Sequence, residues 1–270
     1  MTSIAVLADK TYRTEHDVVR VLGFPVSNVT RSEAVARVRG FLEVPSLHHV
    51  IAANTNKFWL ACHIPGMSEI LAQAEMIIPE YGAVWAARML GTPLSANVRG
   101  IGLFVALLPR LEEWGVPVYL LGAQEEILQM MLGSIRHSWP RLRIAGARNG
   151  FFSPAEEGQV VDDINRSGAG ILFVGMGSPR QEFFIEKNRA RLRPRVAMGV
   201  GGSFDALSGI KKEPPAWTHS GFEWLYRLCQ DPKHLWRRYM RAHPWFIWQT
   251  LRERITGSAP LAPASPRYSD

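Results

Sequence analysis

The fold is decided by two apolar runs that each end in a glycine-rich turn: ILFVGMGSPRQE (Ile171–Glu182) and VAMGVGGSFD (Val196–Asp205). Each run has the length and composition of a buried strand, and the polar residues after each turn open a helix. At such a junction, backbone N–H groups and the positive end of the helix dipole favour an anionic ligand such as a phosphate. We therefore expect neighbouring parallel strands with one shared crevice at their carboxyl ends. The nucleotide-binding candidates in these turns are Gly175, Gly177, Gly201, Gly202, Phe204 and Asp205.

The same two turns can also be read as ordinary strand-to-helix connections without a ligand. The side chains of Arg180, Gln181, Glu182 and Asp205 add more polar function than a turn requires, which favours a binding site. Neither turn completes the dinucleotide pattern G-x-G-x-x-G, because Arg180 and Phe204 occupy its last position. A nicotinamide-dependent enzyme is therefore disfavoured.

The composition is that of a globular protein. The chain has 270 residues, of which 47% are hydrophobic and 20% charged, enough for one large α/β domain or two small ones. Cys62 and Cys229 are far apart and lack metal-ligand spacing, which indicates reduced thiols in a reducing compartment. No secretory signal pattern or long apolar run is present, so we expect a cytoplasmic protein without a membrane span.

The positive charge is concentrated near the C-terminus. From Ile210 onward the chain has ten Lys and Arg residues against five Asp and Glu, which accounts for +5 of the net charge of +7. The same segment holds five of the nine tryptophans. This asymmetry indicates an anionic surface or ligand near that end of the chain.

Strand-like and helix-like segments alternate through most of the chain, which predicts an α/β fold with a parallel sheet covered by helices on both faces. We predict a core over 1–209, a helical segment over 210–256 and a disordered tail over 257–270. The predicted strands are Val19–Leu22 (followed by Pro25), His48–Ala53, Met76–Pro79, Val118–Leu121, Leu142–Ala145, Ile171–Val174 and Val196–Val200. The predicted helices are Ser32–Leu42, Val84–Leu90, Ile101–Trp114, Gln124–His137, Pro154–Ser167 and Arg180–Arg191, followed by Pro-interrupted helices in 210–256.

Two other strand ends carry polar side chains. Asn54 and Asn56 follow the strand His48–Ala53, where an amide can bind sugar hydroxyls or an N-acetyl group, or cap the next helix. Capping explains one amide more readily than two. Glu80 follows the strand Met76–Pro79, and it is placed either as a general base for an incoming hydroxyl or as a solvated loop residue.

Two further residues are weaker candidates for diphosphate binding. Arg99 precedes an apolar helix and can offset charge on a departing phosphate, although a surface arginine is an equal alternative. Gly122 closes the strand Val118–Leu121 and adds a third nucleotide contact. No Asp-x-Asp pair and no cluster with metal-ligand spacing occurs, so we predict no metal and no cofactor.

Taken together, these stretches resemble the WecG/TagA/CpsF family of bacterial glycosyltransferases over His48–Tyr239. The resemblance implies a Rossmann-like fold and inverting transfer of a sugar, commonly N-acetylmannosamine and in some members glucose. The implied donor is a UDP-sugar, and the implied acceptor is a polyprenyl-diphosphate-linked saccharide of a surface or exopolysaccharide pathway. The most specific matching stretches are Met176–Glu182, Gly199–Asp205, Glu223–Leu228, Pro232 and Arg237–Tyr239.

The resemblance also assigns roles to single residues. The family's catalytic Asp falls on Glu80, which keeps the acid but is one methylene longer. The Asn of the family's Thr-x-Asn falls on Asn54, while its Thr is Ala52 here. The leaving-group Arg falls on Asn97, so we take Arg99 as its substitute. The substrate-binding residues expected on these grounds are Asn54, Asn56, Asn97, Gln181, Arg227, Arg237 and Arg238. The changes at Glu80 and Asn97 leave open a catalytically inactive UDP-sugar-binding homologue in a polysaccharide assembly complex.

In this family the C-terminal segment is a membrane-associating appendage that completes the active site, and residues 210–256 fit that role. Each basic residue near an anionic surface contributes about 1 kcal/mol. We therefore predict a peripheral protein on the inner face of the cytoplasmic membrane, with no nucleic acid partner and with homo-oligomers left open. The alternatives are a packed helical subdomain with core tryptophans and a nucleic-acid surface, which leaves the glycine turns unexplained. The candidate membrane residues are Trp217, Trp224, Trp236, Trp245, Trp248, Arg227, Lys233, Arg237, Arg238 and Arg241.

Overall fold

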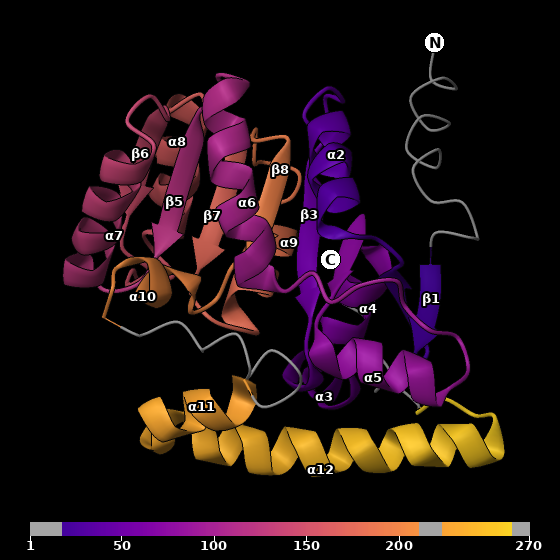
Figure 1. Ribbon diagram of the computed structural model, residues 1–270. Coiled ribbons are helices and arrows are strands. Elements are labelled where there is room, and N and C mark those ends of the chain that lie inside the picture. The colour runs from indigo at the N-terminus through magenta and orange to yellow at the C-terminus, as the bar shows by residue number, and fades with distance from the viewer. Residues whose placement is uncertain (1–17, 211–222, 261–270) are drawn as a thin grey trace.

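The computed structural model describes residues 18–210 and 223–260, and within these ranges a six-stranded sheet forms the centre of the molecule (Figure 1). Its strands are β3 (His48–Ala53), β4 (Met76–Pro79), β5 (Val118–Gly122), β6 (Ile144–Arg148), β7 (Ile171–Gly175) and β8 (Val196–Gly199). They lie in the order β4-β3-β8-β7-β5-β6, and every neighbouring pair is parallel. The predicted α/β, Rossmann-like sheet is confirmed.

Helices cover both faces of this sheet, as predicted. The helices are α2 (Arg31–Phe41), α3 (Thr55–His63), α4 (Met67–Gln73), α5 (Tyr81–Met89), α6 (Gly100–Glu113), α7 (Glu125–Ser138), α8 (Glu157–Arg166), α9 (Arg180–Lys187), α10 (Ser203–Leu207), α11 (Glu223–Gln230) and α12 (Pro232–Thr256). One face packs against α2, α6, α7 and α10. The other packs against α3, α4 and α5 at one end and against α8 and α9 at the other.

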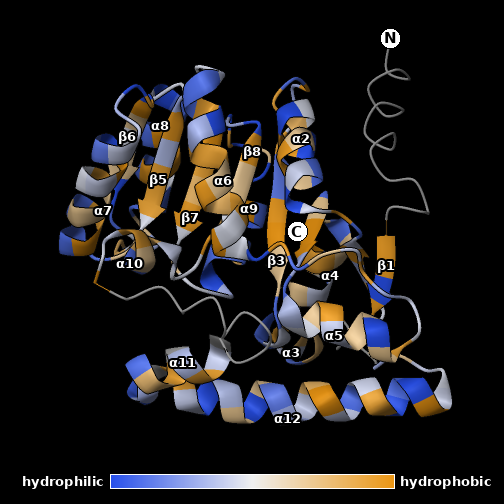
Figure 2. Ribbon diagram, in the orientation of Figure 1, coloured by the Kyte–Doolittle hydropathy of each residue, from blue (hydrophilic) through white to orange (hydrophobic). Residues whose placement is uncertain are grey.

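The strands are apolar on both faces because helices cover both (Figure 2). In β3, Val50 and Ala52 pack on the side of α2 and α6, whereas Ile51 and Ala53 pack on the side of α3 and α4. This two-residue alternation places successive side chains in separate cores. The continuous apolar runs that predicted buried strands therefore have a direct structural cause.

The N-terminal part of the described chain differs from the prediction. A hairpin of β1 (Val18–Val21) and β2 (Phe24–Ser27) replaces the single expected strand Val19–Leu22. Leu22 (φ 51°) and Gly23 (φ 82°) form the two-residue turn between them. A leucine rarely adopts positive φ, so the turn has no clear sequence signal. Pro25 lies within β2 rather than after a strand.

Other elements also differ from the prediction: α5 begins at Tyr81 rather than Val84, α8 begins at Glu157 rather than Pro154, and α9 ends at Lys187 rather than Arg191. Helix α4 was not predicted, and β6 begins at Ile144 rather than Leu142. The Leu142 N–H donates to the Trp139 carbonyl in the turn that follows α7, which delays the strand. Helix α12 continues through Pro244, which is exposed, and the expected proline interruption occurs at Pro232 in its first turn.

The long helix α12 lies across the carboxyl ends of the strands, along the lower edge of the molecule in Figure 1. It packs on α3 and α5 through Phe246, whose ring centroid is 5.3 Å from that of Phe58 and 6.4 Å from that of Trp85. No helix in the described ranges is both long and apolar enough to cross a bilayer. Trp217 and most of the expected disordered tail (261–270) lie outside the described residues.

Two glycines provide a matched test of this architecture. A Cβ added at Gly122 (φ 145°) would lie 2.4 Å from the Gly175 carbonyl oxygen, whereas one at the exposed Gly133 of α7 would meet nothing within 4 Å. We expect Gly122→Ala to lower the free energy of unfolding by at least about 2 kcal/mol. Gly133→Ala should raise it by roughly 0.5–1 kcal/mol, because alanine favours the helix. Urea unfolding of both variants measures this, and equal stabilities would contradict the packing described.

Candidate active site

The turns after β7 and β8 lie side by side, as the sequence predicts. Val174 pairs with Gly199 across the two strands, and the Val200 N–H donates to the Val174 carbonyl at 2.9 Å. The Gln181 side chain then crosses between the turns: its Oε1 accepts the Gly201 N–H at 3.1 Å. The two glycine turns therefore form one continuous edge at the carboxyl ends of adjacent strands.

The predicted glycines serve two different purposes. Gly122 and Gly175 are required by close packing, because a Cβ at Gly175 would lie 2.8 Å from the Phe204 ring and Gly122 abuts Gly175 itself. Gly177 (φ 77°) and Gly201 (φ 53°) are required by positive φ, and a Cβ on either would meet nothing within 4 Å. The ordinary-turn interpretation thus explains the first pair. The space beside the second pair is where a ligand can approach.

The remaining predicted nucleotide contacts differ in accessibility. The Phe204 side chain is only 1% exposed and packs against Phe104 in the core, so a ligand can reach this residue only at its backbone. Gly202 and Asp205 lie in the first turn around the start of α10, where a Cβ on Gly202 would be 3.5 Å from the Asp205 carboxylate. These two residues remain candidates on the accessible side of the turn.

Asn54 and Glu80 lie close together at the carboxyl ends of β3 and β4. They directly follow Ala53 and Pro79, which pair across β3 and β4, and the Glu80 N–H donates to the Ala53 carbonyl at 3.3 Å. The Asn54 side-chain oxygen accepts the Lys57 N–H at 3.0 Å and caps α3, so the capping interpretation holds for this amide. Asn56 is half-buried in the first turn of the same helix.

The loop before α6 carries Asn97 and Arg99, and backbone hydrogen bonds hold it next to Glu80. The N–H groups of Val98 and Arg99 both donate to the Pro79 carbonyl, at 2.9 and 3.3 Å. Glu80 Oε1 accepts the Gly100 N–H at 2.9 Å, at the start of α6. Arg99 has φ 61°, a strained conformation for a residue with a side chain. Such strain is frequent at binding and catalytic sites.

The loop before α6 also contains a buried acceptor, on the side chain of Asn97. Its side-chain Oδ1 is buried, and no described residue donates a hydrogen bond to it. A buried polar atom in this state is costly unless a donor satisfies it. Within the described ranges no three His, Cys, Asp or Glu side chains form a metal-binding group. The absence of a metal requirement remains a prediction about the reaction.

Helix α12 contacts the same edge. His243 Nε2 lies 3.4 Å from Thr55 Oγ1, in the first turn of α3, and the Arg241 guanidinium lies 5.4 Å above the Trp59 ring. Burial lowers the pKa of His243, opposed by a hydrogen bond to the Tyr239 carbonyl. These contacts place the middle of α12 next to the helix that follows Asn54, and Arg237 and Arg238 lie earlier on α12.

The candidate membrane residues separate into two groups. Trp224 and Trp245 pack within the protein, against His243 and His63 respectively, each at 5.3 Å between ring centroids. Trp236 and Trp248 are 53% and 57% exposed. The interpretation as a packed helical subdomain therefore fits Trp224 and Trp245, and it does not fit Trp236 and Trp248. The side chain of Arg227 lies outside the described part of the chain.

The sequence matches a family described as the glycosyl transferase WecG/TagA/CpsF family over residues 19–260. The chain belongs to this family. It is 32% identical over 213 residues to the N-acetylglucosaminyldiphosphoundecaprenol N-acetyl-beta-D-mannosaminyltransferase of Bacillus spizizenii. That match covers 78% of this chain and 81% of the relative.

Sequence reasoning overlooked two residues of this WecG/TagA/CpsF member. Lys57 is 3% exposed and its Nζ lies 3.0 Å from Glu182 Oε1, although a lysine after a strand suggests a solvated position. Phe151 is 67% exposed, directly after Gly150, whose N–H donates to the Ala123 carbonyl beside the β5 turn. Its signal was an Asn-Gly-Phe-Phe run at the end of β6.

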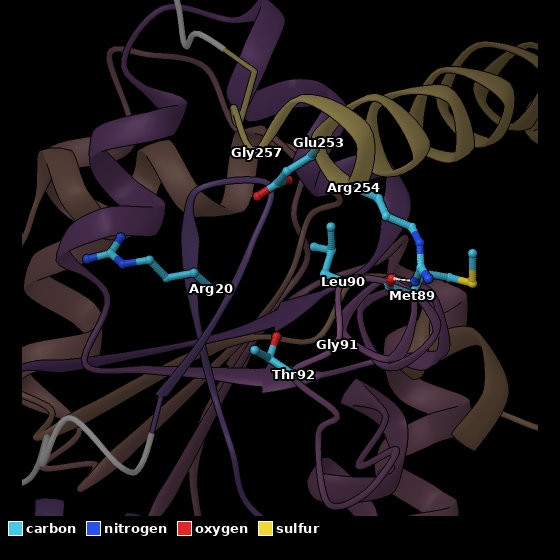
Figure 3. A pocket seen from close by; sticks show the side chains of 8 residues that line it. All are labelled: Arg20, Met89, Leu90, Gly91, Thr92, Glu253, Arg254 and Gly257. Carbon is cyan, nitrogen blue, oxygen red and sulfur yellow. Dashed lines mark hydrogen bonds between the residues drawn. The ribbon is translucent and has the colours of Figure 1, made fainter.

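A pocket of about 540 Å³ lies elsewhere on the molecule, between the ends of α5 and α12 (Figure 3). It is lined by Arg20, Met89, Leu90, Gly91, Thr92, Glu253, Arg254 and Gly257. Arg254 donates to the Met89 carbonyl at the C-terminal end of α5, whereas Glu80 precedes the N-terminal end. None of the predicted site residues lines this pocket, so it is separate from the candidate active site of the WecG/TagA/CpsF fold.

A partly buried ion-pair network joins Glu186, at the C-terminal end of α9, to His49 and Arg189. It should make the stability of this family member depend on pH in the acid range. Burial alone would raise the pKa of Glu186, but hydrogen bonds from His49 (2.6 Å) and Arg189 outweigh it and lower the pKa to about 2. The network therefore stabilises the fold fully above about pH 4.5 and loses this contribution as the pH falls toward 2. We expect Glu186→Gln to be destabilised at pH 7 by a margin that narrows below pH 4.5.

The matched control is Glu43→Gln. Glu43 is 69% exposed and lies 3.6 Å from Arg39 on the surface of α2, so its removal should change stability by less than about 0.5 kcal/mol. Urea unfolding from pH 7 to pH 3 measures both variants. A Glu186→Gln deficit that does not change with pH would contradict the assignment.

Proposed function

We propose that the chain is an inverting glycosyltransferase that moves a sugar of the N-acetylmannosamine or glucose type from a UDP-sugar to a polyprenyl-diphosphate-linked saccharide. Such a reaction belongs to bacterial surface or exopolysaccharide synthesis. The family membership supports it, and the Bacillus spizizenii relative is named for an N-acetylmannosaminyl group and a diphosphoundecaprenol-linked acceptor. The observation that carries the proposal is that Glu80 and the loop of Asn97 and Arg99 are held together at the same carboxyl edge of the sheet as the two glycine turns, with the end of β3 between them.

The donor diphosphate is proposed to bind where Gly177 and Gly201 leave open space at the strand ends. The N-terminal end of α9 contributes a positive dipole there. The exposed ring of Phe151 offers a stacking surface for the base at the neighbouring β5 turn. Asn97 Oδ1, together with the amides of Asn54 and Asn56, would bind hydroxyl or N-acetyl groups of the sugars.

Glu80 is proposed as the general base. Its Oε1 is held by the Gly100 N–H, which leaves Oε2 to take the proton of the acceptor hydroxyl. The acceptor oxygen then bonds to the anomeric carbon from the side opposite UDP, and the bond from that carbon to the UDP oxygen breaks. UDP leaves with the electron pair, and Arg99 with Arg237 or Arg238 stabilises its charge without a metal.

Substitution of Glu80 tests this mechanism. In Glu80→Gln the amide oxygen can still accept the Gly100 N–H, so the loop before α6 is retained while the base is lost. We expect transfer to fall by at least about 100-fold with UDP affinity unchanged. UDP affinity is measured by calorimetry and the transfer rate by product formation, both on the same preparation. Undiminished transfer would refute the assignment, and UDP binding by the wild type without any transfer would favour the inactive sugar-nucleotide-binding homologue.

The exposed face of α12 is proposed to bind the inner surface of the cytoplasmic membrane. Large apolar side chains on this face are interspersed with exposed basic ones, the pattern of an interfacial helix. The apolar members are Trp236, Met240, Ile247, Trp248, Leu251 and Ile255, and the basic members are Lys233, Arg237, Arg241 and Arg252. This surface would hold the site beside a lipid-linked acceptor.

Point substitutions test this surface better than truncation, because Phe246 of the same helix is part of the core. Ile247→Ser with Trp248→Ser should weaken sedimentation with phosphatidylglycerol-containing vesicles by about tenfold or more. High salt should weaken the wild type as well. Met130→Ser, which removes an equally exposed apolar side chain from α7, should have no effect. Unchanged vesicle binding by the double variant would contradict the proposal.

A further inference from the structure

One buried carboxylate joins the ends of three neighbouring strands. Glu182 Oε1, in the first turn of α9, lies 3.0 Å from Lys57 Nζ, 3.0 Å from Ser178 Oγ and 2.8 Å from Gln181 Nε2. Lys57 belongs to the segment after β3, Ser178 to the turn after β7, and Gln181 extends the chain to the Gly201 N–H after β8. These strands are consecutive in the sheet.

The arrangement is enclosed within the protein. The side chains of Lys57 and Glu182 are 4% and 0% exposed. Burial alone would raise the pKa of Glu182, but the Lys57 charge and the hydrogen bonds outweigh it, so the pKa is lowered and the carboxylate remains ionised. A buried charge is strongly unfavourable without its partner, so each member of the pair requires the other.

Both ends of the Gln181 side-chain amide make hydrogen bonds within the protein. Gln181 is 0% exposed, its Nε2 donates to Glu182 and its Oε1 accepts from Gly201. Its amide occupies the space left by Gly199, where a Cβ would lie 2.3 Å from Nε2. To touch a ligand with its side chain, Gln181 would have to leave a buried cavity and break both hydrogen bonds.

We propose that Gln181 is a positioning residue rather than a substrate contact, and that the Lys57–Glu182 pair holds its amide so that the turns after β7 and β8 keep their spacing. This inference rests on the proposed function, because the spaced turns are where the donor diphosphate would bind. It assigns a role to Lys57 and Glu182 and replaces the direct substrate contact that the family resemblance implies for Gln181.

Two double variants test the inference with the charge removed in both. The acceptor-retaining variant, Lys57→Met with Glu182→Gln, keeps an acceptor oxygen for Gln181, whereas the acceptor-deleted variant, Lys57→Met with Glu182→Leu, removes it. Neither leaves an unpaired buried charge, so both should fold, which Tm values and circular dichroism will check. The first readout is hydrogen exchange at the Gly201 amide, and the second is UDP affinity by calorimetry.

We expect the acceptor-retaining variant to keep Gly201 protection and to bind UDP within about threefold of the wild type. In the acceptor-deleted variant, both the hydrogen-exchange protection of the Gly201 amide and the UDP affinity should fall about tenfold. If Gln181 instead contacts the ligand, releasing it from residue 182 should preserve or raise UDP affinity, which would overturn the inference. Equal Gly201 protection in both variants would also overturn it.

The two readouts separate this inference from the proposed function. Gly201 protection reports the position of Gln181 whether or not UDP binds. A wild-type protein that shows no UDP binding, with Gly201 protection lost only in the acceptor-deleted variant, would contradict the donor assignment and leave the positioning role supported. If the wild type binds UDP but Gly201 protection is the same in both double variants, the donor assignment would be supported and the positioning role contradicted.

Discussion

The carboxylate of Glu182 lies fully buried where the ends of β3, β7 and β8 meet, and it accepts hydrogen bonds from groups that belong to different strand-end segments. Backbone turns at the edge of a parallel sheet have few contacts of their own, so their relative positions depend on side chains that bridge them. Here the bridge is ionic at one end, through Lys57, and neutral at the other, through Gln181. The spacing of the glycine turns depends on this connection.

The glycines at the carboxyl ends of the strands are present for two different reasons. Gly122 and Gly175 are small because backbone and an aromatic ring press against them, which is a packing requirement independent of any ligand. Gly177 and Gly201 have positive φ and open space beside them. In these turns some glycines are therefore required by close packing, and others lie next to open space. Helix α12 has a similar double character, since Phe246 is in the core while Trp248 is exposed.

Much of the fold could be predicted because each central strand is an apolar run bounded by glycine, proline or a polar residue. The bounds of β3 and β4 match the prediction, and the position of Glu80 directly after a strand follows from them. The β1–β2 hairpin could not be predicted, because its turn places Leu22 at a positive φ that leucine rarely adopts. The role of Lys57 was also hidden, because a lysine is buried only when a distant residue supplies its counter-charge. The strain at Arg99 likewise arises from a loop that returns to Pro79, which local sequence does not encode.

The proposed glycosyl transfer is best tested by a product assay with a panel of UDP-sugars, including UDP-N-acetylmannosamine and UDP-glucose. The acceptor is a synthetic polyprenyl-diphosphate monosaccharide in detergent with EDTA, and products are identified by mass spectrometry. We expect one new lipid-linked disaccharide, formed in the presence of EDTA and with an inverted anomeric centre. Absence of product with every donor, or a product that forms only when a divalent metal is restored, would contradict the proposed transfer.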